Sequence, residues 1–244
     1  MIAVNAMANI LPINGYNTGQ VSAFYPNAFV PAGFTFSIWG IIYLMLLNYT
    51  IAYTYYKLKP AQFEQVNKYL DRINNFYLGT CILNMTWIIA WHYLQIEISF
   101  LIMLLFLYSL IQLFLKSLFL SPTLNKTQRF LLLSPFLVYL GWISVATIAN
   151  ATALLVAYNW SAFGISVAYW SAFMILIAAV LGLVFLKKYN SYEYPMVIAW
   201  ALWGIHSSQG PIYPFVDSVA TVGSFYLLIM ALILVYKDLK NKIA

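Results

Sequence analysis

Long apolar stretches separated by short polar segments make up most of the chain. A helix needs roughly 17 to 25 apolar residues to cross the hydrocarbon core of a bilayer. Seven stretches meet or approach this length, at about 31–56, 73–94, 98–115, 130–157, 163–186, 194–206 and 218–236. They are too long for strands and lack a strand's alternation. The pattern therefore predicts an all-α, polytopic membrane helix bundle with about seven transmembrane helices.

The basic residues predict the topology of this bundle. The twelve Lys and Arg fall in four segments: 57–72, 116–129, 187–188 and 237–242. The alternate segments contain none: 1–30, 95–97, 158–162 and 207–217. Seven crossings place every basic residue on one side, which the positive-inside rule makes cytoplasmic or its equivalent. We therefore expect a multi-pass protein of a bacterial inner membrane or an organelle membrane, with its C-terminus on the basic side.

The composition agrees with a membrane protein and points to a cavity. Of 244 residues, 64% are hydrophobic and only 7% are charged, whereas a soluble domain has about 25% charged residues. The net charge of +6 lies in the loops, so we expect contact with membrane lipid and no nucleic-acid partner. Aromatic residues make up 18% of the chain, more than lipid contact requires, and some of them are expected to line a binding cavity.

The sequence carries no recognisable catalytic or metal-binding motif. No Asp, Glu, Lys or Arg lies well inside an apolar stretch, and the single Cys81 excludes a disulfide framework. His92 and His206 fall near the non-basic helix ends and lack metal-ligand spacing, so we interpret them as interfacial hydrogen-bonding residues. Asp217 or Ser218 is interpreted as a helix N-cap. We therefore expect no enzymatic activity, no metal and no required cofactor.

Aromatic and amide residues recur along three helix faces. The sets are Trp39 and Tyr43; Asn84, Trp87 and Trp91; and Trp142, Ala146 and Asn150. Because an asparagine in hydrocarbon is unfavourable without a partner, Asn84 and Asn150 should face the bundle interior. Such faces suit a flat, aromatic, apolar ligand. Plain helix packing with interhelical asparagine bonds would produce the same spacing, so this alternative stays open.

Three segments resemble the TspO/MBR family of tryptophan-rich sensory proteins, which includes the translocator protein. FTFSIWGIIYLML (34–46) resembles the second-helix signature of the family, and ILNMTWIIAW (82–91) resembles its third-helix motif. GWISVATIAN (141–150) is similar to its fifth-helix pattern. The three occur in the family's order, and the resemblance covers about residues 12–160.

This resemblance implies a TspO-like core with a ligand pocket inside the bundle. The family's pocket binds porphyrins, haem-like tetrapyrroles and, in some members, sterols. With the face analysis, it gives our predicted ligand-binding residues: Trp39, Tyr43, Asn84, Trp87, Trp142, Ala146 and Asn150. The chain departs from the family at Thr35 and Val138, and no basic residue follows Tyr158 before Lys187. Because the sterol-type motif is absent, we do not expect a sterol ligand.

The two ends of the chain also differ from a five-helix member. We predict a stub with a pocket-covering loop at 1–30, a TspO-like four-helix core at 31–160 and a three-helix extension at 161–244. Only MIAVNAMAN precedes the loop, which is too short to span a membrane. We expect the added helices to lie beside the 130–157 span. The side of the core next to the stub would then be closed by a partner chain or by lipid.

Two functions follow from these features, and a third, an enzyme that degrades porphyrins, is permitted by the family resemblance but supported by no acid, base or metal arrangement in the sequence. The first is a non-enzymatic membrane receptor or carrier for a hydrophobic aromatic ligand, with a tetrapyrrole (porphyrin or haem) as the expected class. The second is a structural or accessory subunit of a larger membrane complex. The expected partners are the tetrapyrrole or another hydrophobic small molecule, lipid, and either a second copy of the chain or a partner membrane subunit.

Overall fold

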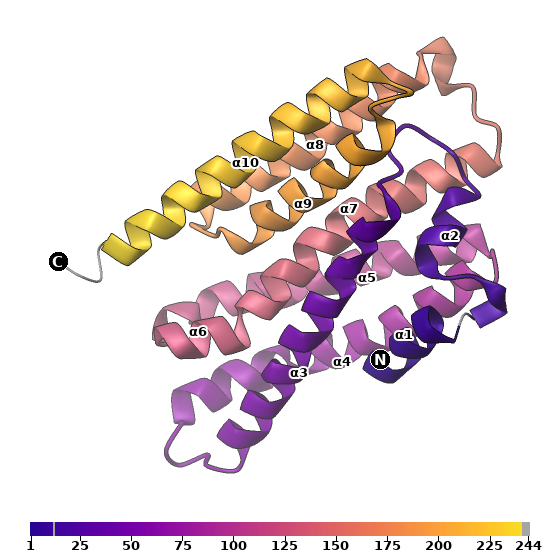
Figure 1. The fold of residues 1–244 in the computed structure, drawn as a ribbon. Coiled ribbons are helices and arrows are strands. Elements are labelled where there is room, and N and C mark those ends of the chain that lie inside the picture. Colours follow the sequence, from indigo (N-terminus) through magenta and orange to yellow (C-terminus); the bar gives the residue numbers. More distant parts are fainter. Residues whose placement is uncertain (12, 241–244) are drawn as a thin grey trace.

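The computed structural model of the protein describes residues 1–11 and 13–240, which form helices and no strand (Figure 1). The long helices are α3 (Ile38–Lys57), α4 (Glu64–His92), α5 (Ile96–Leu120), α7 (Ser134–Ala157), α8 (Val167–Lys188), α9 (Glu193–Gln209) and α10 (Pro214–Lys240). The short ones are α1 (Ile2–Ile10), η1 (Ile13–Gly15), α2 (Thr18–Ala23), η2 (Gly33–Ser37), η3 (Ser121–Thr123), α6 (Lys126–Leu132) and η4 (Ala162–Gly164). The predicted all-α helical bundle is confirmed.

Each predicted apolar stretch corresponds to one long helix. Not every long helix is both long enough and apolar enough to cross a membrane. Five segments meet both conditions: Gly33–Lys57, Ile96–Phe119, Lys126–Ala157, Val167–Lys188 and Pro214–Lys240. The helix α4 is not among them, and its sequence contains the polar Asn74, Asn75 and Asn84. The helix α9 has only 17 residues. Seven crossings therefore stay a prediction for these two helices.

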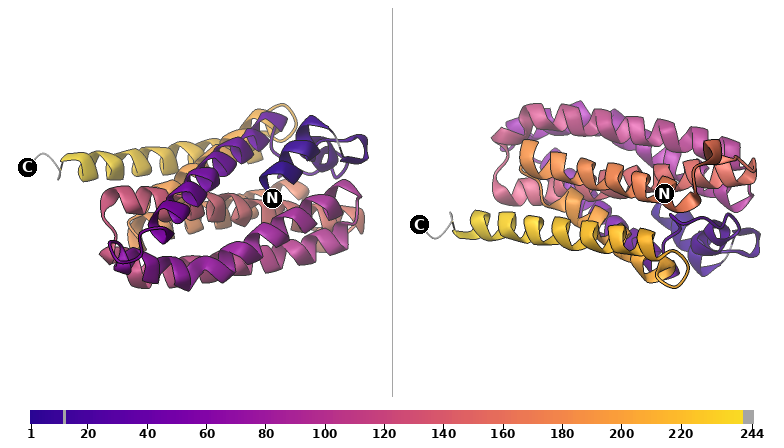
Figure 2. Two further views of the ribbon diagram at one scale, coloured as in Figure 1. Left: turned by 90° about the horizontal axis from the view of Figure 1, so that it is seen from below. Right: turned by 90° about the horizontal axis from the view of Figure 1, so that it is seen from above.

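The helix α7 lies at the centre of the bundle. It packs against α5 on one side and α9 on the other, and α9 in turn packs against α8 and α10 (Figures 1 and 2). The sequence of α7 is apolar all round, as expected of a helix inside a bundle, and its residues from Ser134 to Ala146 are all buried. Gly141 allows the close approach of α9, since an added Cβ would lie 3.1 Å from the Tyr194 carbonyl oxygen.

Of the C-terminal helices, α9 and α8 pack against α7 as expected, whereas α10 packs on α8 and α9 instead. The predicted closure of the stub side by a partner or lipid is wrong at Asn84. The stub forms α1 and packs against α4. The Asn5 side-chain amide donates to the Asn84 Oδ1, and the Asn84 Nδ2 donates to the Tyr139 hydroxyl at 2.8 Å. The stub itself therefore supplies the hydrogen bond that Asn84 requires in an apolar surrounding.

The predicted N-cap at Asp217 or Ser218 is also wrong. The helix α10 begins earlier, at Pro214, so both residues lie inside it. The Asp217 Oδ1 lies 2.5 Å from the His206 Nδ1, and the Thr221 Oγ1 lies 2.9 Å from the same nitrogen. His206 therefore links the end of α9 to the start of α10, which agrees with the interfacial hydrogen-bonding role expected of it.

We predict that Asn5→Ala lowers the free energy of unfolding by about 1–3 kcal/mol, because the buried Asn84 Oδ1 loses its donor. Thermal unfolding of the purified chain in mild detergent measures this change. Met7→Ala is the matched control, since Met7 lies on the same short helix but is 54% exposed. Equal loss in the two variants would show that α1 contributes through its packing and not through Asn5.

Candidate ligand-binding pocket

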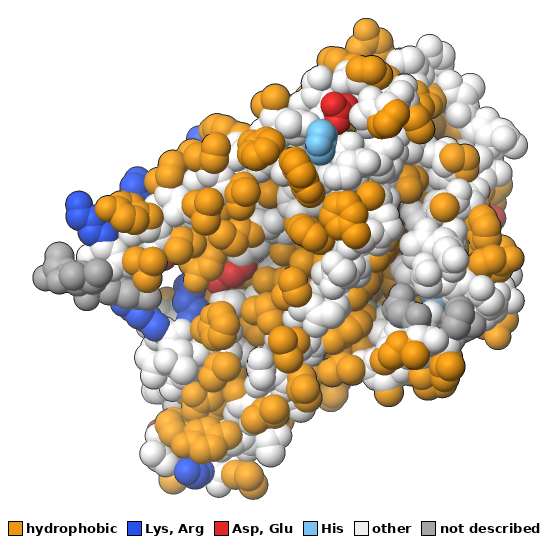
Figure 3. All heavy atoms as spheres, in the orientation of Figure 1, with side chains coloured by type: hydrophobic (Ala, Val, Ile, Leu, Met, Phe, Trp, Pro, Cys, Tyr) orange, Lys and Arg blue, Asp and Glu red, His pale blue; other side chains and the backbone are white. Residues whose placement is uncertain are grey.

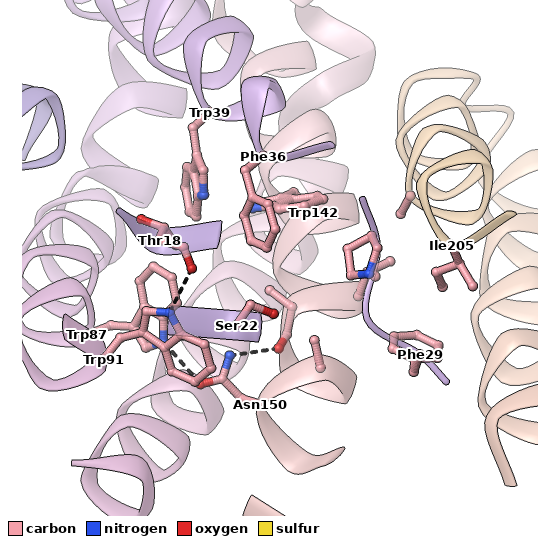
Figure 4. Close-up of a pocket in the computed structure, with 15 residues that line it drawn as sticks. Thr18, Ser22, Phe29, Phe36, Trp39, Trp87, Trp91, Trp142, Asn150 and Ile205 are labelled. Atoms are coloured by element: carbon pink, nitrogen blue, oxygen red, sulfur yellow. Dashed lines mark hydrogen bonds between the residues drawn. The ribbon is translucent and has the colours of Figure 1, made fainter. Parts of the chain in front are cut away.

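A cavity of about 30 Å³ lies between α4, α7 and α9 (Figure 4). The helix α2 and the segment through η2 cover it. Its wall consists mainly of aromatic and small apolar side chains: Phe29, Pro31, Phe36, Trp39, Trp87, Trp91, Trp142, Val145, Ala146, Ala149, Ala201 and Ile205, with Thr18, Ser22 and Asn150 as its polar members. The wall contains no charged side chain, so a ligand there would meet aromatic faces, hydroxyls and one amide.

Four tryptophans form a continuous cluster along this wall. The ring centroids of Trp39 and Trp87 are 5.9 Å apart, and those of Trp87 and Trp91 are 6.1 Å apart in a stacked arrangement. Trp142 meets Trp39 edge-on, with centroids 6.1 Å apart and an interplanar angle of 83°. Offset and edge-to-face pairs at these distances stabilise each other beyond area burial alone. The cluster therefore forms an apolar surface of fixed shape.

Helical spacing places these side chains on the cavity side of their helices. Trp87 and Trp91 are four residues apart on α4 and share one face. On α7, Trp142, Ala146 and Asn150 follow at the same spacing. The small Ala146 between two larger residues leaves room for the cavity.

Hydrogen bonds fix the orientation of the rings. The Asn150 Oδ1 accepts from the Trp87 Nε1 at 3.2 Å and from the Ser99 Oγ at 2.9 Å. The Trp91 Nε1 donates to the Thr18 carbonyl oxygen at 3.2 Å. The Trp142 Nε1 is buried and has no hydrogen-bond partner among the residues that the structure describes. This N–H group is therefore free to donate a hydrogen bond to a ligand in the cavity.

The cover over the cavity, which we call the lid (residues 13–37), is attached to the end of α4. The His92 Nδ1 lies 3.2 Å from the Ile13 carbonyl oxygen, and its Nε2 lies 3.2 Å from the Thr18 Oγ1. The Asn14 Nδ2 donates to the His92 carbonyl oxygen at 3.0 Å. His92 thus holds η1 and α2 against the helix that carries Trp87 and Trp91.

The other edge of the lid is attached to α9. The Trp200 Nε1 donates to the Thr35 carbonyl oxygen at 2.9 Å, and the Gln209 Nε2 donates to the Val30 carbonyl oxygen at 2.8 Å. The Ala32 N–H donates to the Gly204 carbonyl oxygen at 2.9 Å. The C-terminal part of the chain therefore helps to close the pocket of the core.

The model for the family described as TSPO-like protein matches residues 1–234. The chain belongs to this family. The match extends the resemblance beyond 12–160 and includes most of α10. No curated protein and no solved structure matches the chain. Family membership and the five apolar helices make it an integral membrane protein of the TspO type.

Five of the seven predicted ligand-binding residues line the cavity of this TSPO-like protein: Trp39, Trp87, Trp142, Ala146 and Asn150. The other two lie outside its wall. Tyr43 stacks on Trp39 with ring centroids 5.4 Å apart, so it supports a wall residue from behind. The Asn84 amide is bonded to Asn5 and Tyr139. Whether any of these residues binds a ligand stays a prediction.

The sequence predicts a pocket-covering loop at 1–30, but the predicted residue set contains none of the wall residues of the lid or of α9. Trp91 shares a helix face with Trp87 and could have been included on spacing alone. Phe36 and Phe29 lie in a turn-rich segment without helical or strand periodicity, so the sequence does not indicate which way their side chains point. Ala201 and Ile205 belong to a helix outside the quoted motifs, and small apolar residues carry no signal of their own.

Among the residues that the structure describes, no group of three His, Cys, Asp or Glu side chains is placed to hold a metal ion. His92 uses both ring nitrogens on the lid, as described above.

The cavity is closed in this structure. A volume of about 30 Å³ accommodates about two water molecules, since one needs roughly 10–15 Å³. Sites for drug-sized ligands measure roughly 300–1,000 Å³. A ligand as large as a tetrapyrrole therefore does not fit the cavity in this closed form.

We predict that Gly204→Ala displaces the lid. An added Cβ would lie 2.8 Å from the Thr35 Cγ2 and closer to its hydroxyl, so η2 must move away from α9. Overpacking of this kind destabilises by about 1–3 kcal/mol, measurable as a lower thermal unfolding temperature together with faster hydrogen exchange in residues 24–37. Gly79→Ala is the control, because nothing lies within 4 Å of its added Cβ. Unchanged exchange in the lid would contradict the prediction.

Proposed function

We propose that this TSPO-like protein is a non-enzymatic membrane receptor or carrier that binds a hydrophobic aromatic molecule, with a tetrapyrrole as the ligand class, in the tryptophan-lined cavity. The observation that carries the proposal is the cluster of Trp39, Trp87, Trp91 and Trp142 around one cavity under a lid of the same chain. Indole faces in an apolar enclosure favour a flat aromatic ring system through stacking and area burial.

The polar groups of the wall support binding over catalysis. They are the hydroxyls of Thr18 and Ser22, the Asn150 amide and the Trp142 N–H. The wall has no carboxylate, imidazole or thiol that could act as an acid or base. The Trp142 N–H, which lacks a partner among the described residues, suits a ligand with one hydrogen-bond acceptor at its edge. An acceptor that satisfies this donor would orient the ring system.

In this proposal the closed structure is the resting form, and the lid admits the ligand by moving. The lid is short helices and turns, tied to α4 and α9 by the few hydrogen bonds described above. Segments of this kind open at lower free energy than the helices beneath them. Ligand binding then replaces the contacts between the lid and the tryptophans with contacts to the ligand.

The second candidate is a structural or accessory subunit of a larger membrane complex. The small cavity volume, about 30 Å³, favours it, because a cluster that never opens is simply a packed core. A titration of the purified chain in mild detergent with protoporphyrin, followed by tryptophan fluorescence, separates the two functions. Saturable one-site quenching supports the receptor, and co-purifying membrane subunits without quenching support the accessory role.

We predict that Trp39→Ala and Trp142→Ala each weaken protoporphyrin binding by about 1–3 kcal/mol, through loss of a stacked ring and its buried area. The quenching titration measures the dissociation constants. Trp160→Ala is the control, because Trp160 packs against Phe163 and Trp170 away from the cavity. If all three variants lose the same affinity, the loss reflects general destabilisation and the pocket assignment fails.

The topology that we propose has every Lys and Arg on the cytoplasmic-equivalent side and the lid on the opposite side. A single cysteine at Gln62 or at Ile212, in a Cys81→Ala background, tests it in sealed vesicles. Both positions are exposed, one in a basic loop and one in a loop without basic residues. A membrane-impermeant maleimide should label only one of the two from outside. Labelling of both cysteines from the same side would contradict the proposed topology, in which an odd number of crossings separates Gln62 from Ile212.

A further inference from the structure

A second and larger cavity, of about 670 Å³, lies far along the bundle from the tryptophan cluster. It is open to the outside and lined by α6, by the turn between α8 and α9, and by the last turns of α10. Figure 3 shows this hollow near the end of the molecule where basic side chains gather, with an acidic side chain inside it. We call it the charged cavity. The residues that matter for its chemistry are Lys126, Arg129, Phe130, Glu193, Asp238 and Leu239.

Glu193 is the unusual residue of the charged cavity. It is only 7% exposed, and its carboxylate accepts from the Ser134 Oγ at 2.6 Å and from the Ser191 Oγ at 2.9 Å. In the described part of the chain it forms no ion pair. A buried carboxylate held by two neutral hydroxyls lacks the cation that normally compensates its desolvation. The cavity beside it is where such a cation can be supplied.

Two cationic side chains lie on the α6 wall. Lys126 and Arg129 are three residues apart and therefore share a helix face. Within residues 1–11 and 13–240, neither forms an ion pair with a carboxylate. A guanidinium presents paired N–H donors that match a phosphate, and a lysine adds a second positive charge. This wall can therefore hold a phosphate group.

Charges of both signs act on Tyr192, which also lines the charged cavity. Burial raises the pKa of Tyr192, the nearby Glu193 carboxylate raises it further, and the Arg129 guanidinium opposes this rise. The Asp238 carboxylate on α10 acts in the same direction as Glu193. All three charged groups are thus close enough to act on one side chain. The cavity carries two positive and two negative groups, so its lining favours a ligand with both signs over a simple anion.

We propose that the charged cavity binds a ligand with a primary ammonium and a phosphodiester, namely the head group of phosphatidylethanolamine. The phosphate would lie against Arg129 and Lys126, and the ammonium would donate to the Glu193 carboxylate. The cavity lies where the basic residues mark the membrane interface, a depth at which head groups bind between helices. Phe130 and Leu239 on its wall give the acyl chains an apolar path away from the charges. The site is independent of the tryptophan cavity and of its proposed ligand.

Native mass spectrometry of the delipidated full chain in mild detergent tests the proposal. The probes are phosphatidylethanolamine, phosphatidylcholine and phosphatidylglycerol with identical acyl chains. We expect phosphatidylethanolamine to bind most tightly. The choline group has no N–H to donate to Glu193, and the glycerol group has no positive charge. Equal retention of all three lipids would overturn the proposal, and tightest binding of phosphatidylglycerol would replace it with a site for anions only.

Two variants assign the roles. Glu193→Gln should abolish the preference for phosphatidylethanolamine over phosphatidylcholine, and Arg129→Gln should weaken both lipids by about tenfold, as expected for loss of a charge-assisted hydrogen bond. The controls are Glu64→Gln and Lys187→Gln, which change charge on exposed residues of the same end outside the cavity. A preference that survives Glu193→Gln would sink the ammonium assignment.

A further arm identifies the source of the head group. Free phosphoethanolamine is added to the chain loaded with phosphatidylethanolamine, at the same head-group concentration as the lipid. Retention of the lipid supports the membrane source, because the acyl chains contribute to binding. Displacement at equal head-group concentration would keep the ammonium and phosphate chemistry but overturn the lipid. If Glu193→Gln does not fold, the wild-type comparison of the three lipids still decides whether the ammonium is recognised.

Discussion

The structure depends on one constraint, which is that polar groups inside a bilayer have no water to bond and must find partners within the protein. Two asparagines show how this decides the arrangement of helices. Asn84 brings together α1, α4 and α7, because its partners are Asn5 and Tyr139. Asn150 connects α7 to α4 and α5 through Trp87 and Ser99. The apolar surfaces would pack in many ways, and these bonds select one of them.

The tryptophan cavity is a consequence of the same constraint. An indole N–H also needs a partner when buried, so Trp87 and Trp91 are held in the orientations that their acceptors dictate. Because one of these acceptors is a backbone carbonyl of α2, ordering the rings also positions the lid. The Trp142 N–H stands apart, since no described residue satisfies it. The cavity wall thus has fixed rings at Trp87 and Trp91, and at Trp142 it has a hydrogen-bond donor that a ligand could use.

The sequence predicts the helices well because each one needs a long apolar stretch, which is a local property. It also identifies Trp39, Trp87 and Trp142 as a group, since helical spacing and the family motifs point to the same faces. It does not reveal what covers those faces. The bond from Trp200 to Thr35 joins residues 165 positions apart, and neither residue carries a local signal for this contact. The closure of the core by the stub helix could not be predicted for a similar reason. The helix is too short to span a membrane, and it contributes through the bond from Asn5 to Asn84.

The arrangement of α9 also explains which part of the molecule can move. This helix borders both cavities, with Glu193 at the charged end and Ile205 at the tryptophan end, and it is enclosed by α7, α8 and α10. Moving it would disturb the close contact at Gly141 and both sites at once. The lid is held by separate hydrogen bonds, each contributing about 1 kcal/mol net. Opening through the lid would break these bonds and expose the buried Val21, Ala28 and Phe29, whereas opening through α9 would require the whole bundle to repack.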